Sequence, residues 1–112
     1  MGETIEVEEA RLALAANEAT AIDVREKEQW IEGHIPGAHH VPEDEWGEGG
    51  GDLPGENKLI IACEDGKRSA ELADELSEGD REAVALEGGM EAWRSADCPM
   101  QPSTDPDEDV PI

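Results

Sequence analysis

The sequence predicts a single α/β domain in which a parallel sheet is covered by helices on both faces. The chain has 112 residues, which is near the usual length of one compact domain. Short apolar runs alternate along it with segments of helical periodicity, and the connections between them are short. Parallel strands need such crossovers, and right-handed crossovers place helices on both sides of the sheet. We expect the domain to fill residues 1–100 and an acidic, Pro-rich tail to fill residues 101–112.

The N-terminal half shows three apolar segments separated by helical or turn-like sequence. We expect, in chain order, a short edge strand at 4–7, a helix of about ten residues, a buried strand at 21–25, a helix at 26–33 stopped by glycine, and a brief strand at 38–41. Residues 43–57 are rich in Gly and acidic side chains, which indicates a surface connection.

The C-terminal half carries the strongest pattern. LIIAC at 59–63 is a continuous apolar strand, and a helix begins after three intervening residues and stops near Gly79. One face of this helix carries apolar or small residues at i, i+3, i+4 and i+7, namely Ser69, Leu72, Ala73 and Leu76. A strand at 83–86 and a last helix with Met90 and Trp93 on one face follow. From Cys98 onward, prolines and acids predict an extended or disordered tail.

The charge of the chain is strongly negative. Thirty acidic and eight basic residues give a formal charge of −22, which argues against nucleic acid or an anionic membrane as a partner. This excess favours a salt-adapted source, since the screening length falls to roughly 3 Å at 1 M salt. A basic protein partner, or an acidic interaction tail at 105–109, is the alternative. The acidic N-terminus and the absence of an apolar stretch of roughly 20 residues lead us to expect a cytoplasmic protein.

Two cysteines, Cys63 and Cys98, are too few for a disulfide framework, so one of them could be a working thiol. Cys63 lies where a parallel strand ends and a helix begins, which is where open α/β sheets bind ligands. The free N–H groups and the positive dipole end of that helix favour a thiolate. Gly66 allows the loop to turn successive N–H groups inward, and Lys67 and Arg68 add positive charge. A buried, inert cysteine is the simpler alternative.

The segment C-E-D-G-K-R-S at 63–69 resembles the active-site loop of the rhodanese sulfurtransferases. Three further strings occur in the order that this family shows: DVRE at 23–26, GHIPGAHHVP at 33–42 and LEGGMEAW at 86–93. The resemblance spans residues 5–100 and implies a central parallel sheet of about five strands.

The resemblance implies that Cys63 cycles between thiolate and persulfide. The donor would be a small sulfur compound such as thiosulfate or a protein persulfide, and the acceptor a thiol or a cyanide-like compound, with no cofactor and no metal. The loop implied to bind substrate consists of Cys63, Glu64, Asp65, Gly66, Lys67 and Arg68, with Arg68 closing it. The supporting polar residues would be Asp23, Arg25 and Ser69. The alternative is a non-catalytic module of the same fold that docks a partner through its acidic surface.

Two features of the loop bear on its chemistry. Four residues separate Cys63 from Arg68, whereas related phosphatases of this fold have one more, so sulfur is favoured over phosphate. Glu64 and Asp65 stand where many relatives have neutral or basic residues, and we expect their charge to weaken the binding of anionic donors.

Other reactive or aromatic residues receive structural interpretations. His34, His39 and His40 match no compact metal-ligand pattern with Cys63, and His34 is expected to be a hydrogen-bonded structural residue. Cys98 is interpreted as a small apolar residue, with a resolving disulfide to Cys63 as the alternative. Trp30 and Trp93 are expected in the core, whereas the sequence does not place Trp46.

Overall fold

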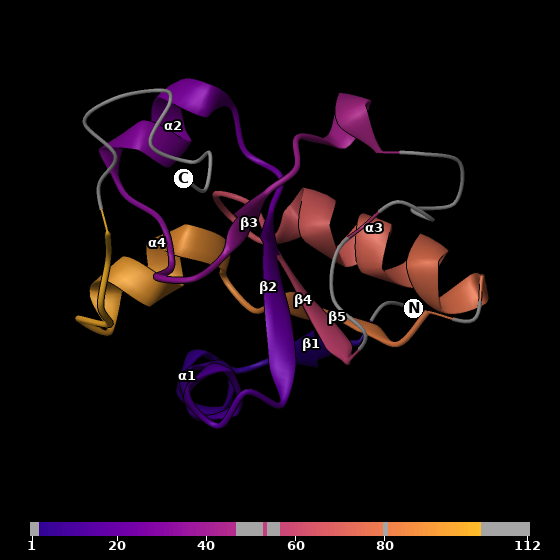
Figure 1. Cartoon of the computed structure of the whole chain (residues 1–112), viewed down its shortest axis with the longest axis horizontal. Coiled ribbons are helices and arrows are strands. Elements are labelled where there is room, and N and C mark those ends of the chain that lie inside the picture. The colour runs from indigo at the N-terminus through magenta and orange to yellow at the C-terminus, as the bar shows by residue number, and fades with distance from the viewer. Residues whose placement is uncertain (1–2, 47–52, 54–56, 80, 102–112) are drawn as a thin grey trace.

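The computed structural model describes residues 3–46, 53, 57–79 and 81–101. They form a five-stranded, wholly parallel sheet, which confirms the predicted parallel sheet of about five strands. The strand order is β1-β5-β4-β2-β3 (Figure 1). The strands are β1 (Thr4–Ile5), β2 (Ala19–Asp23), β3 (His39–His40), β4 (Lys58–Ala62) and β5 (Ala83–Leu86). The helices are α1 (Val7–Ala15), α2 (Lys27–Glu32), α3 (Lys67–Glu78) and α4 (Gly89–Ser95), with a 3-10 turn, η1 (Glu43–Glu45).

The central strand β4 has apolar side chains on both faces because both faces of the sheet are covered. Leu59 and Ile61 point to one side, and Ile60 and Ala62 point to the other. Such a strand must be apolar throughout rather than alternating, which is why LIIA is a continuous apolar run.

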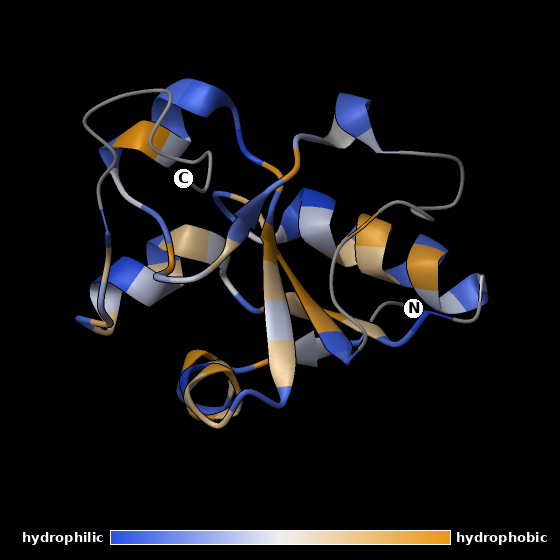
Figure 2. Ribbon diagram, viewed as in Figure 1, coloured by the Kyte–Doolittle hydropathy of each residue, from blue (hydrophilic) through white to orange (hydrophobic). Residues whose placement is uncertain are grey.

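The helices divide between the two faces of the sheet (Figure 1). Helix α3 packs against one face, and α1 and α4 cover the other. The core under α3 contains Ile22, Leu53, Leu59, Ile61, Leu72, Ala73, Leu76, Ala83 and Ala85. The core under α1 and α4 contains Ile5, Ala10, Ala19, Ala21, Ile35, Ile60, Ala62, Val84, Leu86, Met90, Trp93 and Cys98. Figure 2 shows hydrophobic colour along the central strands and hydrophobic and hydrophilic turns alternating on α3.

Helix α3 confirms the predicted periodicity. The four residues that share its predicted face, Ser69, Leu72, Ala73 and Leu76, are its buried residues. The helix ends at Glu78, and the N–H of Gly79 bonds the Leu76 carbonyl. This packing fixes the start of α3 against the end of β4, where the candidate site lies.

Several boundaries differ from the predicted ones. Strand β1 ends at Ile5, because Val7 already begins α1. Strand β2 covers 19–23 rather than 21–25, since its pairing with β4 starts at Ala19 and ends at Asp23. Within the predicted connection at 43–57, Leu53 is buried in the core under α3. Residues 47–52 and 54–56 of that connection lie outside the described residues.

The first residues of the predicted tail, 98–101, pack on the domain. Cys98 is buried, Met100 packs on the core under α4, and the indole of Trp93 donates to the Pro99 carbonyl at 2.8 Å. Gln101 forms an antiparallel bridge with His34. The segment 98–101 is therefore docked on the domain, and residues 102–112, where the acidic tail is expected, lie outside the described residues.

None of the helices in the described segments is long and apolar enough to cross a membrane.

Candidate functional site

Cys63 immediately follows β4 at the carboxyl edge of the sheet, as predicted. Its side chain is buried, with 7% of its surface exposed. The strand delivers the cysteine to this edge, and α3 begins four residues later at Lys67. The site is thus a loop between two elements that the core holds rigidly.

The sulfur of Cys63 receives two backbone N–H groups. Gly66 N lies 3.1 Å from Sγ and Ser69 N lies 3.3 Å from it. The hydroxyl of Ser69 is also 3.3 Å from Sγ and donates to the Gly66 carbonyl at 3.1 Å. Gly66 has a φ of +90°, which L side chains rarely adopt, and this conformation turns its N–H inward. The arrangement can stabilise negative charge on the sulfur.

The start of α4 supports the loop from behind. The N–H of Met90 donates to the Cys63 carbonyl at 2.8 Å, and the N–H of Glu91 donates to the Glu64 carbonyl at 3.0 Å. Gly89 has a φ of +62°, and a Cβ there would lie 2.5 Å from the Cys63 carbonyl oxygen. Only glycine fits this approach, so Gly89 keeps the loop and α4 in direct backbone contact.

Asp65 and Lys67 lie at the start of α3. The Asp65 carboxylate accepts the N–H of Lys67 at 3.0 Å, and the same oxygen lies 3.9 Å from Sγ of Cys63. This places a negative charge close to the sulfur, as the sequence led us to expect. The side chain of Lys67 is exposed at the surface.

Arg68 lies on the exposed side of α3, with 46% of its side chain accessible. Its guanidinium donates to Glu71 at 2.6 Å, three residues further along the same helix. The role that the family resemblance implies for Arg68, closing the loop over the sulfur, stays a prediction.

Arg25 and Asp23 form a buried ion pair beside the loop. The Arg25 guanidinium donates to the Asp23 carboxylate at 2.9 Å and to the Gly33 carbonyl at 2.6 Å. Burial by itself lowers the pKa of Arg25, but bonding and attraction to Asp23 and then Glu64 raise it above its ordinary value. The third partner, Glu64, accepts from Arg25 at 3.2 Å and links this pair to the Cys63 loop.

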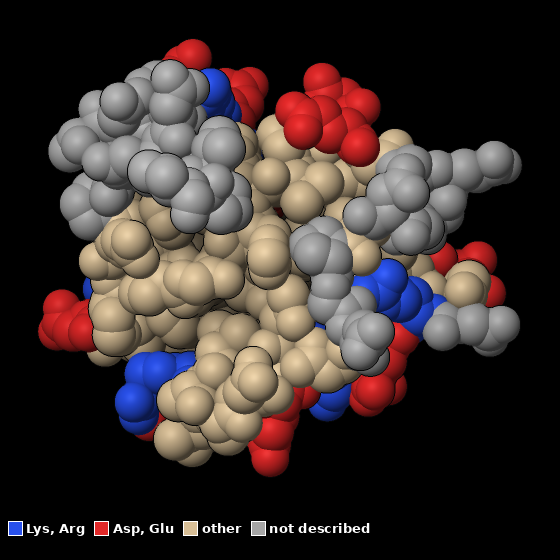
Figure 3. All heavy atoms as spheres, in the orientation of Figure 1, with Lys and Arg blue, Asp and Glu red and all other residues tan. Residues whose placement is uncertain are grey.

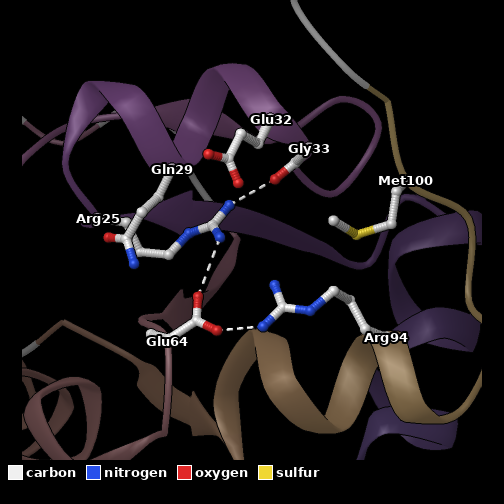
Figure 4. A pocket seen from close by; sticks show the side chains of 7 residues that line it. All are labelled: Arg25, Gln29, Glu32, Gly33, Glu64, Arg94 and Met100. Atoms are coloured by element: carbon white, nitrogen blue, oxygen red, sulfur yellow. Dashed lines mark hydrogen bonds and ion pairs between the residues drawn. The ribbon is translucent and has the colours of Figure 1, made fainter.

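Glu64 lies between two arginines (Figure 4). One carboxylate oxygen pairs with Arg25 and the other with Arg94 of α4. Burial by itself raises the pKa of Glu64, but bonding and attraction from Arg94 and Arg25 outweigh it and leave the pKa lowered. The expected repulsion of anionic donors by Glu64 is therefore offset by this pairing, and Asp65 is the acidic side chain beside the sulfur.

The histidines have structural contacts. His34 is buried, its Nδ1 lies 3.0 Å from the Trp30 carbonyl, and its ring stacks on Trp30 with centroids 3.5 Å apart. His40 also stacks on Trp30 and bonds the Arg25 carbonyl through Nε2 at 2.8 Å. Across the described ranges there is no group of three or more His, Cys, Asp or Glu placed to hold a metal ion.

The remaining cysteine and tryptophans pack in the fold. Cys98 is a free thiol in the core under α1 and α4, and burial raises its pKa. Trp93 is buried in the same core, whereas the buried Trp30 packs on histidines. Trp46, which the sequence left unplaced, packs on the core under α3 and donates to the Val41 carbonyl at 2.9 Å.

Two residues of the site escaped sequence reasoning. Arg94 has no motif of its own, although one signal was available, because basic residues number only eight in the chain. Gly89 belongs to the LEGGMEAW string, but the string does not reveal that α4 abuts the Cys63 carbonyl.

The fold and the site together define an α/β domain with a cysteine-centred, anion-stabilising loop at the carboxyl edge of its sheet. The family model of the rhodanese-like domain matches residues 6–96, so the chain belongs to the rhodanese-like domain family.

Relatives and solved structures agree with this assignment. The chain is 39% identical over 105 residues to the probable adenylyltransferase/sulfurtransferase MoeZ of Mycobacterium tuberculosis, covering 90% of this chain but 26% of MoeZ. It is 35% identical over 85 residues to the putative sulfurtransferase YtwF of Bacillus subtilis, covering 76% of this chain and 82% of YtwF. The crystal structure of a rhodanese-related protein from Thermoplasma volcanium superposes with a TM-score of 0.80 at 27% identity, covering 88% of this chain and 97% of that one.

Proposed function

We propose that this domain is a sulfurtransferase or sulfur carrier that holds sulfur as a persulfide on Cys63. The Cys63 thiolate attacks the sulfane sulfur of a donor, and the bond between that sulfur and the rest of the donor breaks. The donor fragment leaves with the bonding electron pair. A thiophilic acceptor then attacks the outer sulfur, and Cys63 returns to its thiolate form.

The observation that carries this proposal is the pair of N–H groups directed at the sulfur. Gly66 N and Ser69 N lie 3.1 and 3.3 Å from Sγ. Fixed donors of this kind stabilise a thiolate or the charge spread over a persulfide without any reorganisation during the reaction. No general base is needed to move sulfur between thiolates, which fits a sulfur whose described bonding partners include no histidine.

The names of the relatives support the same chemistry at the level of the family. MoeZ and YtwF both carry the word sulfurtransferase in their names. The chain spans about a quarter of the length of MoeZ, so only the matched part of that protein is relevant here. The four-residue spacing between Cys63 and Arg68 also favours sulfur over the larger phosphate group.

Asp65 bears on the identity of the donor. Its carboxylate lies 3.9 Å from Sγ, so a small dianion such as thiosulfate would approach against a fixed negative charge. A protein persulfide carries less charge at the reacting sulfur, and it is the natural donor in this proposal.

The experiment is steady-state sulfur transfer to cyanide, measured as thiocyanate, for the wild type and two single variants. Cys63→Ser abolishes turnover, whereas Cys98→Ser, which alters a core thiol three residues beyond the end of α4, retains most of it. An inactive Cys98→Ser variant beside an active Cys63→Ser variant would show that Cys98, and not Cys63, carries the sulfur.

The second candidate is a non-catalytic module that docks a partner through its acidic surface. Support for it comes from a relative named HTH-type transcriptional regulator Rv0324, of Mycobacterium tuberculosis, which is 32% identical over 100 residues. Against it, the acidic side chains seen on the face in Figure 3 lie in separate groups around its edge rather than in one patch. A wild type that forms no persulfide with any donor favours this candidate.

The proposal extends to the environment of the protein. A formal charge of −22 favours a cytoplasm of high salt concentration, in which screening relieves repulsion among the acids.

A further inference from the structure

The two edges of the sheet differ in charge. Strand β1 forms one edge, and the exposed acids Glu3 and Glu6 flank it on either side. Strand β3 forms the other edge, and residues 33–42 around it contain no Asp, Glu, Lys or Arg, although the chain has 30 acids. Charged residues at an edge strand keep a further strand from pairing with it. The β1 edge is protected in this way, whereas the β3 edge is not.

The backbone of β3 has hydrogen-bonding groups that point away from the sheet. His40 pairs with Asp23 in the register, and the N–H of Val41 donates to the Asp23 carbonyl at 3.0 Å. Because backbone groups alternate in direction along a strand, the N–H and C=O of His40 point away from β2. Strand β3 ends the strand order, so no further strand of the described sheet lies on that side. The β3 edge thus offers one donor and one acceptor to an added strand.

The surface beside β3 is hollowed and lacks acidic side chains. A cavity of about 440 Å³ borders the strand, and none of the residues that line it is Asp or Glu. Three other cavities that the described residues form each include acids, among them Glu9, Glu26 and Glu32. Strand β3 lies at the front of the view in Figure 1, and the described atoms at the centre of the same face in Figure 3 belong to uncharged residues. Side chains of an added strand can enter this cavity without meeting an acid.

The charge of the chain selects the partner for the β3 edge. A basic partner gains most from the acid-bearing surfaces and least from this one. A second copy of the chain carries the same charge of −22, so it is repelled by every acid-bearing surface and can approach only a face without acids. Such a contact is two-fold symmetric, and a two-fold axis sets an edge strand antiparallel to its copy.

We propose that two copies of this chain dimerise through their β3 edges and form one continuous sheet across the two-fold axis. The outward N–H of His40 in one copy donates to the outward carbonyl of the same residue in the other, and the reverse bond forms as well. Because the two sheets run in opposite directions, the Cys63 loops lie at opposite edges of the combined sheet and stay open. The inference is therefore independent of the chemistry proposed for Cys63.

The dimer depends on salt. Strand β3 has two residues, so few backbone bonds cross the axis and the contact is weak. The acids outside the contact still repel one another, and this repulsion is screened only in concentrated salt. Association therefore strengthens as the salt concentration rises.

The test is sedimentation equilibrium of the full chain over a concentration series. It is carried out in molar and in tenth-molar sodium chloride, where the screening length is roughly 3 and 10 Å. Circular dichroism of the same samples checks that the chain remains folded. We expect a monomer–dimer equilibrium in molar salt whose dissociation constant rises about tenfold or more in tenth-molar salt.

Two pairs of variants separate the contact from general effects. His39→Asp and Thr4→Asp each add one acid at an exposed position of an edge strand, on β3 and β1 respectively. Only His39→Asp should raise the dissociation constant, by about threefold or more, because it brings two acids together across the axis. His40→Ala and His40→Pro lose the same side-chain contacts, but only proline also removes the outward N–H. His40→Pro should therefore weaken the dimer relative to His40→Ala.

A folded chain that stays monomeric in molar salt overturns the inference and leaves the β3 edge to a different partner. Equal effects of His39→Asp and Thr4→Asp, or of the two His40 variants, would show that the contact lies elsewhere. A dimer that strengthens as salt is withdrawn would indicate pairing of opposite charges and would contradict a contact through an acid-free face.

Discussion

Gly89 provides a sharp test of how the loop is held, because the structure supplies a matched control. Gly89 has a φ of +62°, and an added Cβ would lie 2.5 to 2.6 Å from Cys63 O, Glu64 O and Gly66 N. Gly37 has a φ of +83°, but nothing lies within 4 Å of an added Cβ there. The two glycines thus share the backbone conformation and differ in the steric contact.

The magnitudes follow from these contacts. A left-handed conformation costs an L residue about 1–2 kcal/mol, which is the whole expected loss for Gly37→Ala. In Gly89→Ala the start of α4 must also move about 1 Å away from the Cys63 loop, so that the added Cβ reaches ordinary van der Waals distance. That movement weakens the bond from Met90 N to the Cys63 carbonyl, at a further cost of about 1–3 kcal/mol. We expect a total loss of about 2–5 kcal/mol for Gly89→Ala.

The assay is urea unfolding followed by tryptophan fluorescence, in molar sodium chloride, for the wild type and both alanine variants. Gly89→Ala should also slow persulfide formation, since opening the contact moves the Gly66 N–H away from the sulfur. Equal losses of stability in the two variants would mean that backbone strain alone matters and that α4 does not support the loop.

Three further predictions concern charge. Asp65→Asn should lower the KM for thiosulfate more than Glu64→Gln does. Asp65 lies beside the sulfur, whereas Glu64 is already paired with Arg25 and Arg94. An equal effect of the two variants in steady-state assays would contradict this geometry. Because the pKa of Glu64 is lowered in the folded state, its pairing stabilises the fold at pH values above the unfolded pKa of about 4.3. This stabilisation is lost as the pH falls through the lower pKa of the folded state. The wild type should therefore lose stability below about pH 4 more steeply than Glu64→Gln in urea unfolding, and parallel curves would argue against the pairing. The thermal midpoint should fall as sodium chloride is reduced from 1 M to 0.01 M, where the screening length grows from roughly 3 to 30 Å; a flat midpoint would remove the basis for salt adaptation.

The parts of the fold that depend on local pattern were predictable from the sequence. The run LIIAC gives a strand buried on both faces, and the spacing of Ser69, Leu72 and Leu76 gives the buried face of α3. Both patterns arise because the residues that face the core must be apolar or small, and these residues recur with the period of the strand or helix that carries them. The position of Cys63 at the strand end follows directly from these two elements.

The contacts between distant segments were not predictable in the same way. Glu64 pairs with Arg94, which lies thirty residues further along the chain, and no periodicity in the sequence indicates that pairing. The loop was therefore expected to repel anions at both of its acidic residues, whereas the fold neutralises one of them. The prolines and acids beyond Cys98 likewise predicted an extended or disordered tail from that residue onward, but the Trp93 indole and His34 hold segment 98–101 through its backbone groups.

The central claim is that Cys63 carries transferable sulfur. The most direct measurement is the intact mass of the protein after incubation with thiosulfate or a persulfide donor, before and after cyanide is added. The account predicts a gain of one sulfur atom in the wild type and in Cys98→Ser, its removal by cyanide, and no gain in Cys63→Ser. A gain that persists in Cys63→Ser, or a wild type that gains no sulfur from any donor, would contradict it.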